Sequence, residues 1–185
     1  MISLQFLLTA LVVVLAPGTG VIYTLAIGLG QGRWPAIAAA FGCTFGIVPH
    51  LLAATFGLAA LLHTSAILFQ IVKFAGVAYL LYLAWQMLKS GGALAVSRDA
   101  SKDTAWHIAK RGALINILNP KLPMFFLAFL PQFMTGDTPY ALELLVFGGT
   151  FVVVEVIYEL TLAHFAQQVA PWLSRCGRWF NRITG

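Results

Sequence analysis

Five long apolar runs, separated by short polar turns, dominate the pattern of this chain. A helix needs roughly 20 mostly apolar residues to cross about 30 Å of hydrocarbon, and each run reaches about that length. The runs cover residues 2–28, 36–62, 67–88, 112–133 and 142–170. The sequence therefore predicts an all-α membrane protein with five transmembrane helices.

Helix-breaking residues interrupt the first and fourth predicted spans near their middle. The first span contains Pro17-Gly18-Thr19-Gly20, and the fourth contains Asn119-Pro120-Lys121 shortly after Asn116. Proline removes a helical hydrogen bond, and irregular backbone is tolerated at membrane depth only where neighbouring groups satisfy it. We therefore expect both spans to be broken helices whose ends form a site. A simple packing kink is the alternative at each position.

The polar segment 89–111 is predicted to be a basic cytoplasmic linker between two halves of the chain. The N-terminal half, residues 1–88, carries three spans, and the C-terminal half, residues 112–185, carries two spans and a basic cytoplasmic tail. Each half opens with a proline-interrupted span, and these two spans start on opposite sides of the membrane. We therefore expect an inverted 3+2 repeat. Inverted repeats with discontinuous helices are typical of secondary transporters, whose sites lie near mid-membrane.

The positions of lysine and arginine in the short loops predict the orientation of the chain. Arg33, the 89–111 segment and the arginines of the tail fall on one side, whereas the turns at 63–65 and 134–141 contain neither lysine nor arginine. We expect the basic side to be cytoplasmic. The N-terminus then lies outside and the C-terminus lies in the cytoplasm.

The composition of the chain argues against a water-soluble protein and against a nucleic-acid partner. Hydrophobic residues make up 60% of the chain and charged residues only 9%, whereas soluble domains are about a quarter charged, so membrane lipid is the expected surrounding. The net charge of +5 comes from short segments rather than from a basic patch interleaved with aromatic residues, which disfavours a nucleic-acid partner. Cys43 and Cys176 lack the spacing of a metal site, so we expect no metal and no cofactor.

Three ionisable residues inside the predicted spans, Lys121, Glu155 and Glu159, are candidates for coupling transport to proton or ion movement. Each costs on the order of 3 kcal/mol to insert at mid-depth. Glu155 and Glu159 share one helix face at i,i+4 spacing, and two such carboxylates do not both ionise easily in a low-dielectric setting. We expect Lys121 to pair with one of them while a proton resides on the other. A static ion pair, or a carboxylate held neutral by hydrogen bonds, is the alternative.

The chain resembles the LysE/RhtB-type amino-acid exporters over nearly its whole length. The resemblance is carried by residues 16–18, 42–50 and 73–80, and most specifically by Asn119-Pro120-Lys121 followed by Phe129-Leu130-Pro131-Gln132-Phe133. It implies a secondary transporter of the bacterial inner (plasma) membrane that exports amino acids or similar small metabolites by proton antiport. Two features depart from the family: Thr19 stands where a second proline is usual, and a sixth span usually follows the basic tail.

For an amino-acid substrate, the two breaks are the expected place of binding. A half-helix amino terminus beyond either proline offers free N–H groups to a carboxylate, the asparagines offer hydrogen bonds, and His50 or Glu155 can face the ammonium group. The predicted substrate-binding residues are Pro17, Gly18, Thr19, His50, Asn116, Asn119 and Pro120. Interhelical hydrogen bonding by the asparagines and packing of the histidine in the core are the alternatives.

Two other functions stay open at this point. A truncated or accessory membrane protein without transport activity would explain the five-span count, and a second copy of the chain would then cover the shorter half, which makes a homo-oligomer possible. An intramembrane enzyme would use Glu155, Glu159 and His164, which lie on one predicted helix. The sequence contains no His-Glu-x-x-His and no Gly-x-Ser-x-Gly motif, however, so we expect no enzymatic activity.

Overall fold

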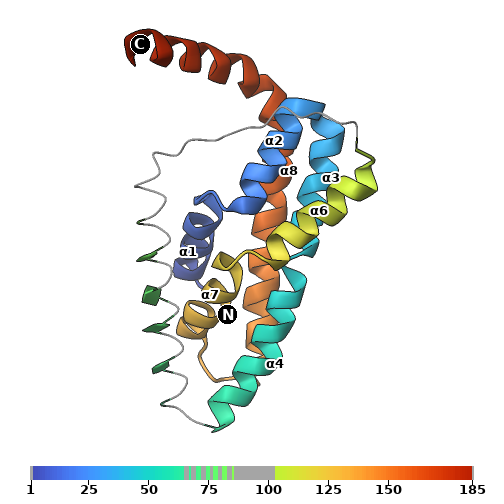
Figure 1. Cartoon of the computed structure of the whole chain (residues 1–185). Coiled ribbons are helices and arrows are strands. Elements are labelled where there is room, and N and C mark those ends of the chain that lie inside the picture. Colours follow the sequence, from blue (N-terminus) through green and yellow to red (C-terminus); the bar gives the residue numbers. More distant parts are fainter. Residues whose placement is uncertain are drawn as a thin grey trace.

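The computed structural model describes residues 2–64 and 103–184, together with residues 67, 70, 71, 74, 75, 77, 78, 81, 82 and 85. This described part is helical, without a strand (Figure 1). The elements are α1 (Leu4–Leu15), α2 (Thr19–Gln31), α3 (Arg33–Phe45), α4 (Val48–Thr64), α6 (Ala105–Ile117), α7 (Lys121–Ala128), the short 3-10 helix η1 (Leu130–Phe133) and α8 (Tyr140–Thr184). The predicted all-α class is therefore confirmed for the residues described.

Two helices are long and apolar enough to cross a membrane, and two bent helix pairs satisfy the same test together. The two helices are Arg33–Gly57, formed by α3 and α4, and Tyr140–Ala166 within α8. The pairs are α1 with α2, bent by 55°, and α6 with α7 and η1, bent by 49°. The described residues thus hold two to four spans. The predicted third span and most of the 89–111 linker lie outside them, so the five-span count and the inverted repeat stay predictions.

Both predicted breaks occur where the prolines stand. Helix α1 ends at Leu15, Ala16 and Gly18 are extended, and α2 begins at Thr19. Helix α6 ends at Ile117, and α7 begins after Pro120. The physical reason is local, because a proline offers no N–H to the carbonyl four residues before it.

Two helix boundaries differ from the sequence-based expectation. Helix α6 begins at Ala105, inside the predicted linker, because the Thr104 hydroxyl caps it by accepting a hydrogen bond from the His107 N–H (3.4 Å). Helix α8 runs on to Thr184, so the segment expected to be a basic tail continues the last helix.

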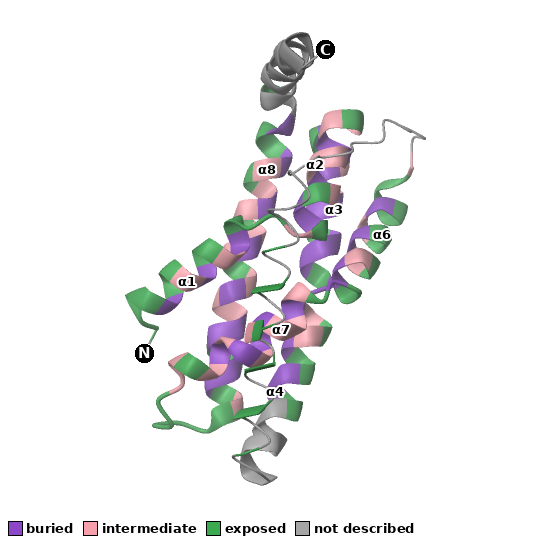
Figure 2. Cartoon of the chain, turned by 60° about the vertical axis from the view of Figure 1, so that its left-hand side comes forward, coloured by how far each residue is buried: buried purple, intermediate pink, exposed green. Residues whose placement is uncertain are grey.

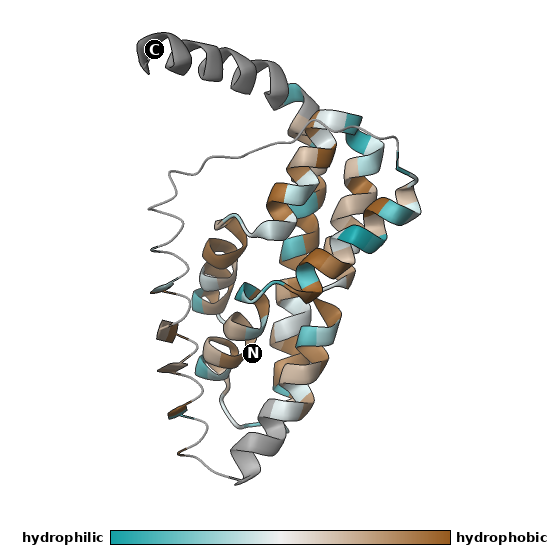
Figure 3. Ribbon diagram, in the orientation of Figure 1, coloured by the Kyte–Doolittle hydropathy of each residue, from teal (hydrophilic) through white to brown (hydrophobic). Residues whose placement is uncertain are grey.

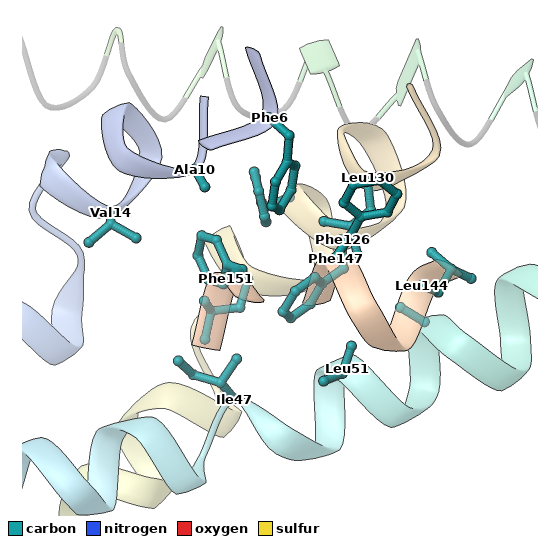
Figure 4. Close-up of a cluster of buried hydrophobic side chains, with 13 residues drawn as sticks. Phe6, Ala10, Val14, Ile47, Leu51, Phe126, Leu130, Leu144, Phe147 and Phe151 are labelled. Carbon is teal, nitrogen blue, oxygen red and sulfur yellow. The ribbon is translucent and has the colours of Figure 1, made fainter. Parts of the chain in front are cut away.

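The packing divides into two groups of helices along α8. Helices α1, α4 and α7 lie beside its N-terminal part, whereas α2 and α3 lie beside its later turns, with α6 packed against α2 and α3 (Figure 1). Each group encloses an apolar cluster. The phenylalanine cluster (Figure 4) consists of Phe6, Ala10, Val14, Ile47, Leu51, Ala54, Leu122, Phe125, Phe126, Leu130, Leu144, Phe147 and Phe151. The small-residue cluster consists of Ile27, Ala36, Ala39, Ile108 and Ala163.

Buried polar residues lie between these two clusters in each of the two long helices and in each of the two bent helix pairs. In α8, Glu155 and Glu159 stand between Phe151 of the phenylalanine cluster and Ala163 of the small-residue cluster. The other spans repeat this order, with the buried polar residues Thr24, Thr44, Asn116 and Asn119. Figure 2 shows the buried residues concentrated along the middle of the bundle, and Figure 3 shows polar positions among the apolar ones there. We call this region the polar layer.

The backbones of helices α3 and α6 touch where the two helices cross, because glycines of α3 lie at the contact. A Cβ on Gly42 would overlap the backbone of Ala109, and a Cβ on Gly46 would lie 2.5 Å from the Ala113 carbonyl oxygen. Close approach through small residues is the usual way in which membrane helices associate. This contact holds the second predicted span against the fourth and so positions the polar layer.

The crossing leads to a first prediction. We expect Gly42→Ala to lower the free energy of unfolding by about 1–3 kcal/mol, because overpacking forces the backbones apart. Gly57→Ala is the matched control, since a Cβ at Gly57 has open space around it and alanine favours a helix over glycine. Thermal unfolding of the detergent-purified variants measures both effects. Equal loss of stability in the two variants would show that the crossing does not depend on Gly42.

Candidate functional site

The two broken spans meet, and Lys121 joins them. Its ammonium nitrogen Nζ donates hydrogen bonds to the carbonyl oxygens of Val13 and Ala16, both at 2.6 Å. The Val13 carbonyl would normally accept from the N–H of residue 17, which is a proline and has none. The lysine at the second break therefore supplies the donor that is missing at the first break. A cation also suits the C-terminal end of α1, where the helix dipole is negative.

His50 supplies a hydrogen-bond donor at the second break, as Lys121 does at the first. The Asn116 carbonyl would normally accept from the N–H of residue 120, which is again a proline. Instead it accepts from the ring nitrogen Nε2 of His50 at 3.1 Å and from the Asn119 N–H at 3.1 Å. At each break, a basic side chain from a different span thus satisfies the carbonyl that proline leaves without its helical partner.

The two asparagines tie the breaks to the neighbouring helices. The Asn116 side-chain nitrogen Nδ2 donates to the Cys43 carbonyl at 2.8 Å, and its Oδ1 accepts from Asn119 Nδ2 at 3.5 Å. The Asn119 Oδ1 in turn accepts from the Lys121 N–H at 3.1 Å. Gly20 packs so closely that a Cβ there would lie 2.6 Å from Asn116 Oδ1. In this conformation the asparagines act as hydrogen-bonding links between helices, which was one of the two interpretations open from the sequence.

The remaining predicted substrate residues divide by exposure. Gly18 faces the second break, since a Cβ on it would lie 3.4 Å from Asn119 Nδ2 and 3.6 Å from Lys121 Cδ. Pro17, Thr19 and Pro120 are exposed, so their side chains do not line the interior of the bundle. No side chain caps the start of α2, which leaves the first-turn N–H groups of that helix available beside Lys121 and Asn119.

The two glutamates of α8 are buried in the polar layer, and neither forms an ion pair with another residue in the described part of the chain. Glu155 is 7% exposed and Glu159 is 0% exposed. The one ion pair between described residues joins Arg111 and Asp103 at 3.1 Å. The expected pairing of Lys121 with a glutamate is therefore wrong for this conformation, because its ammonium group is taken up by the α1 carbonyls. The charge of Lys121 is still close enough to act on Glu155 and Glu159.

Thr24 and Cys43 also belong to the polar layer, although the sequence analysis assigned neither a role. The Cys43 thiol lies 3.8 Å from the Gly20 carbonyl oxygen, to which it donates, and the Thr24 hydroxyl donates to the Cys43 sulfur at 4.0 Å. A signal was present in the sequence, since Thr24 follows Gly20 by one helical turn and shares its face. The facing position of Cys43 is decided by packing between spans.

A separate polar feature holds the turn before α8 in place. The Glu143 carboxylate accepts hydrogen bonds from the N–H groups of Thr135 (3.0 Å), Gly136 (3.5 Å) and Thr138 (3.4 Å) and from both threonine hydroxyls. A cavity of about 210 Å³ adjoins this turn, at the end of the phenylalanine cluster and away from the breaks. The carboxylate is fully engaged, so we assign it a structural role.

The fold and the site together are those of an α-helical membrane protein in which two broken spans meet at a buried polar layer, an arrangement typical of secondary transporters. A family model described as "LysE type translocator" matches residues 11–185. The chain therefore belongs to the LysE translocator family, as the motifs around the two breaks predict.

The chain is also similar in sequence to proteins that are named as efflux proteins. The chain is 32% identical over 168 residues to the homoserine/homoserine lactone efflux protein of Salmonella typhimurium, covering 91% of this chain and 82% of that protein. It is 33% identical over 135 residues to the leucine efflux protein of Klebsiella pneumoniae, covering 71% of this chain and 62% of that protein. No solved structure matches the chain.

Proposed function

We propose that this chain exports amino acids or closely related small metabolites from bacterial cells across the inner membrane. The observation that carries the proposal is the meeting of two broken spans, joined by Lys121, at a polar layer that holds Glu155 between two apolar clusters. Family membership and the efflux proteins among the relatives also support an export function. The N-terminus is outside and the C-terminus cytoplasmic in this proposal, because the basic loop residues then lie inside.

The chemistry of the site suits the end of an amino acid that carries the α-ammonium group and the carboxylate. Homoserine, homoserine lactone and leucine share an α-ammonium group and a carbonyl oxygen. Glu155 is a buried carboxylate without an ion-pair partner among the described residues and supplies the counter-charge for the ammonium group. The uncapped N–H groups at the start of α2, with Lys121 and Asn119 beside them, supply donors for the carbonyl or carboxylate oxygens.

Transport then proceeds by alternating access between the two apolar clusters. Opening at the small-residue cluster exposes the polar layer to the cytoplasm, and opening at the phenylalanine cluster exposes it to the outside. Proton antiport drives export, with one glutamate of α8 carrying the proton. Lys121 and His50 stabilise the breaks in the conformation described, and both are free to exchange partners when the spans move.

The alternatives gain less support from the arrangement of side chains. His164 is exposed, whereas Glu155 and Glu159 are buried, so these three residues do not form a common catalytic group. Assembly of two copies stays a prediction, and the mass of the purified protein in detergent measures it.

An export assay tests the proposed function directly. Cells that produce the full chain are loaded with L-homoserine, L-homoserine lactone or L-leucine, and release into the medium is followed against cells that produce the Glu155→Gln variant at the same membrane level. We expect faster release of at least one of these compounds with the unchanged chain. Equal release of all three from both strains would contradict the proposal.

A further inference from the structure

Glu159 is buried in a way that an ionised carboxylate does not tolerate. Its exposure is 0%, and neither carboxylate oxygen has a hydrogen-bond partner among the described residues. An unpaired charge in such a place costs several kcal/mol, so the group takes up a proton instead. The burial of Glu159 therefore favours the protonated carboxylic acid over the carboxylate.

The groups that face Glu159 come from four helices. Cys43 on α3, Lys121 on α7, and Glu155 and Tyr158 on α8 all lie within electrostatic range. The Thr24 hydroxyl of α2 lies close enough to form a hydrogen bond with the Glu159 carboxyl, although in this conformation it donates to the Cys43 sulfur. The neighbourhood thus has polar groups that can accept or pass on a proton, and no cation of the described residues forms an ion pair with Glu159.

Glu155 sits in a different environment, although it is only one helical turn away. It lies one turn from Phe151 of the phenylalanine cluster, whereas Glu159 lies one turn from Ala163 of the small-residue cluster. The charge of Lys121 acts more strongly on Glu155 than on Glu159. The two carboxyls are thus separated along α8 and differ in how strongly the charge of Lys121 acts on them.

We propose that the two glutamates have different roles in transport. Glu159 carries the coupled proton, and Glu155 stays ionised and binds the substrate ammonium group. The inference rests on the proposed export function and deepens it by assigning each carboxyl its own ligand. Opening of the small-residue cluster admits water to Glu159 first. The O–H bond of its carboxyl then breaks, the proton passes to water on the cytoplasmic side, and the carboxylate remains until a proton from the outside replaces it.

Transport in vesicles separates the two roles. The full chain, Glu159→Gln and Glu155→Gln are reconstituted into lipid vesicles, with Gly57→Ala as a control whose added methyl group has free space. Two rates are measured with radiolabelled L-homoserine and L-leucine: exchange at equal pH on both sides, and accumulation driven by a pH difference. We expect Glu159→Gln to keep exchange and lose pH-driven accumulation, because glutamine cannot release a proton. Glu155→Gln is expected to lose both.

Infrared absorption of the purified protein gives a second measurement that does not require transport. The carbonyl stretch of a protonated carboxyl should be present in the unchanged chain and in Glu155→Gln, and absent in Glu159→Gln. Persistence of that band in Glu159→Gln, or pH-driven accumulation by that variant, overturns the assignment. If the unchanged chain transports neither amino acid, the proposed export of these compounds fails, while the infrared comparison still decides whether Glu159 holds the proton.

Discussion

Replacing Lys121 with methionine is expected to abolish export and to destabilise the protein. The substitution keeps most of the side-chain length but removes both hydrogen bonds to the end of α1. The Val13 carbonyl is partly buried, and leaving such a group without a donor inside a membrane costs about 1–3 kcal/mol. Export fails as well, because the charge that acts on Glu155 from across the break is gone. Thermal unfolding in detergent and the release assay measure the two effects separately.

A second substitution tests the reason for this loss. In the double variant Pro17→Ala/Lys121→Met, alanine at position 17 has an N–H that can reach the Val13 carbonyl in the ordinary helical manner. We expect the double variant to recover stability relative to Lys121→Met while export stays absent. If Pro17→Ala restores no stability, the ammonium group does not replace the missing N–H, and Lys121 stabilises the break by some other contact.

Replacing Glu155 with glutamine is expected to weaken amino-acid binding by about 30-fold or more. The change keeps the shape of the side chain and removes the negative charge. Truncating one partner of a buried, hydrogen-bonded charge pair typically costs about 2–5 kcal/mol, which corresponds to roughly 30-fold or more in affinity at about 1.4 kcal/mol per factor of ten. Calorimetric titration of the purified protein with L-homoserine and L-leucine measures the affinity.

Analogues of the ligand provide the control for that experiment. A compound that lacks the α-ammonium group should bind the unchanged chain and Glu155→Gln equally weakly. A large difference between the two proteins for such a compound, or unchanged affinity of Glu155→Gln for L-homoserine, would contradict the role of Glu155 as the counter-charge of the ammonium group.

The two breaks share one construction, which bears on how the transporter moves. At each break the carbonyl four residues before a proline accepts from a basic side chain of another span, Lys121 in one case and His50 in the other. Such bonds can be exchanged when the spans shift, whereas a backbone N–H cannot leave its carbonyl without unwinding the helix. Similar use of the two breaks is also what an inverted repeat predicts for the two halves of the chain.

The sequence predicted which residues lie near the two breaks, but it did not predict their hydrogen-bond partners. The structure places Gly18, His50, Asn116, Asn119 and Lys121 beside the two breaks, and their roles in substrate binding or coupling stay predictions. Their hydrogen-bond partners differ from the expectation, because the ion pair expected for Lys121 is replaced by bonds to carbonyls. Thr24 and Cys43 were missed, since an uncharged hydroxyl and a single thiol in apolar runs give little signal until the helices that carry them are packed together.

The sequence by itself determined the apolar spans, the places where two of them break, and the presence of charges inside them. These features follow from local chemistry, because proline lacks an N–H wherever it stands and a long apolar run favours lipid in any context. Only the packing of the helices decides which donors satisfy the broken ends and which glutamate is fully buried. Lys121 and the Val13 carbonyl are 108 residues apart along the chain, and only the packing of the spans brings such distant groups within hydrogen-bonding distance.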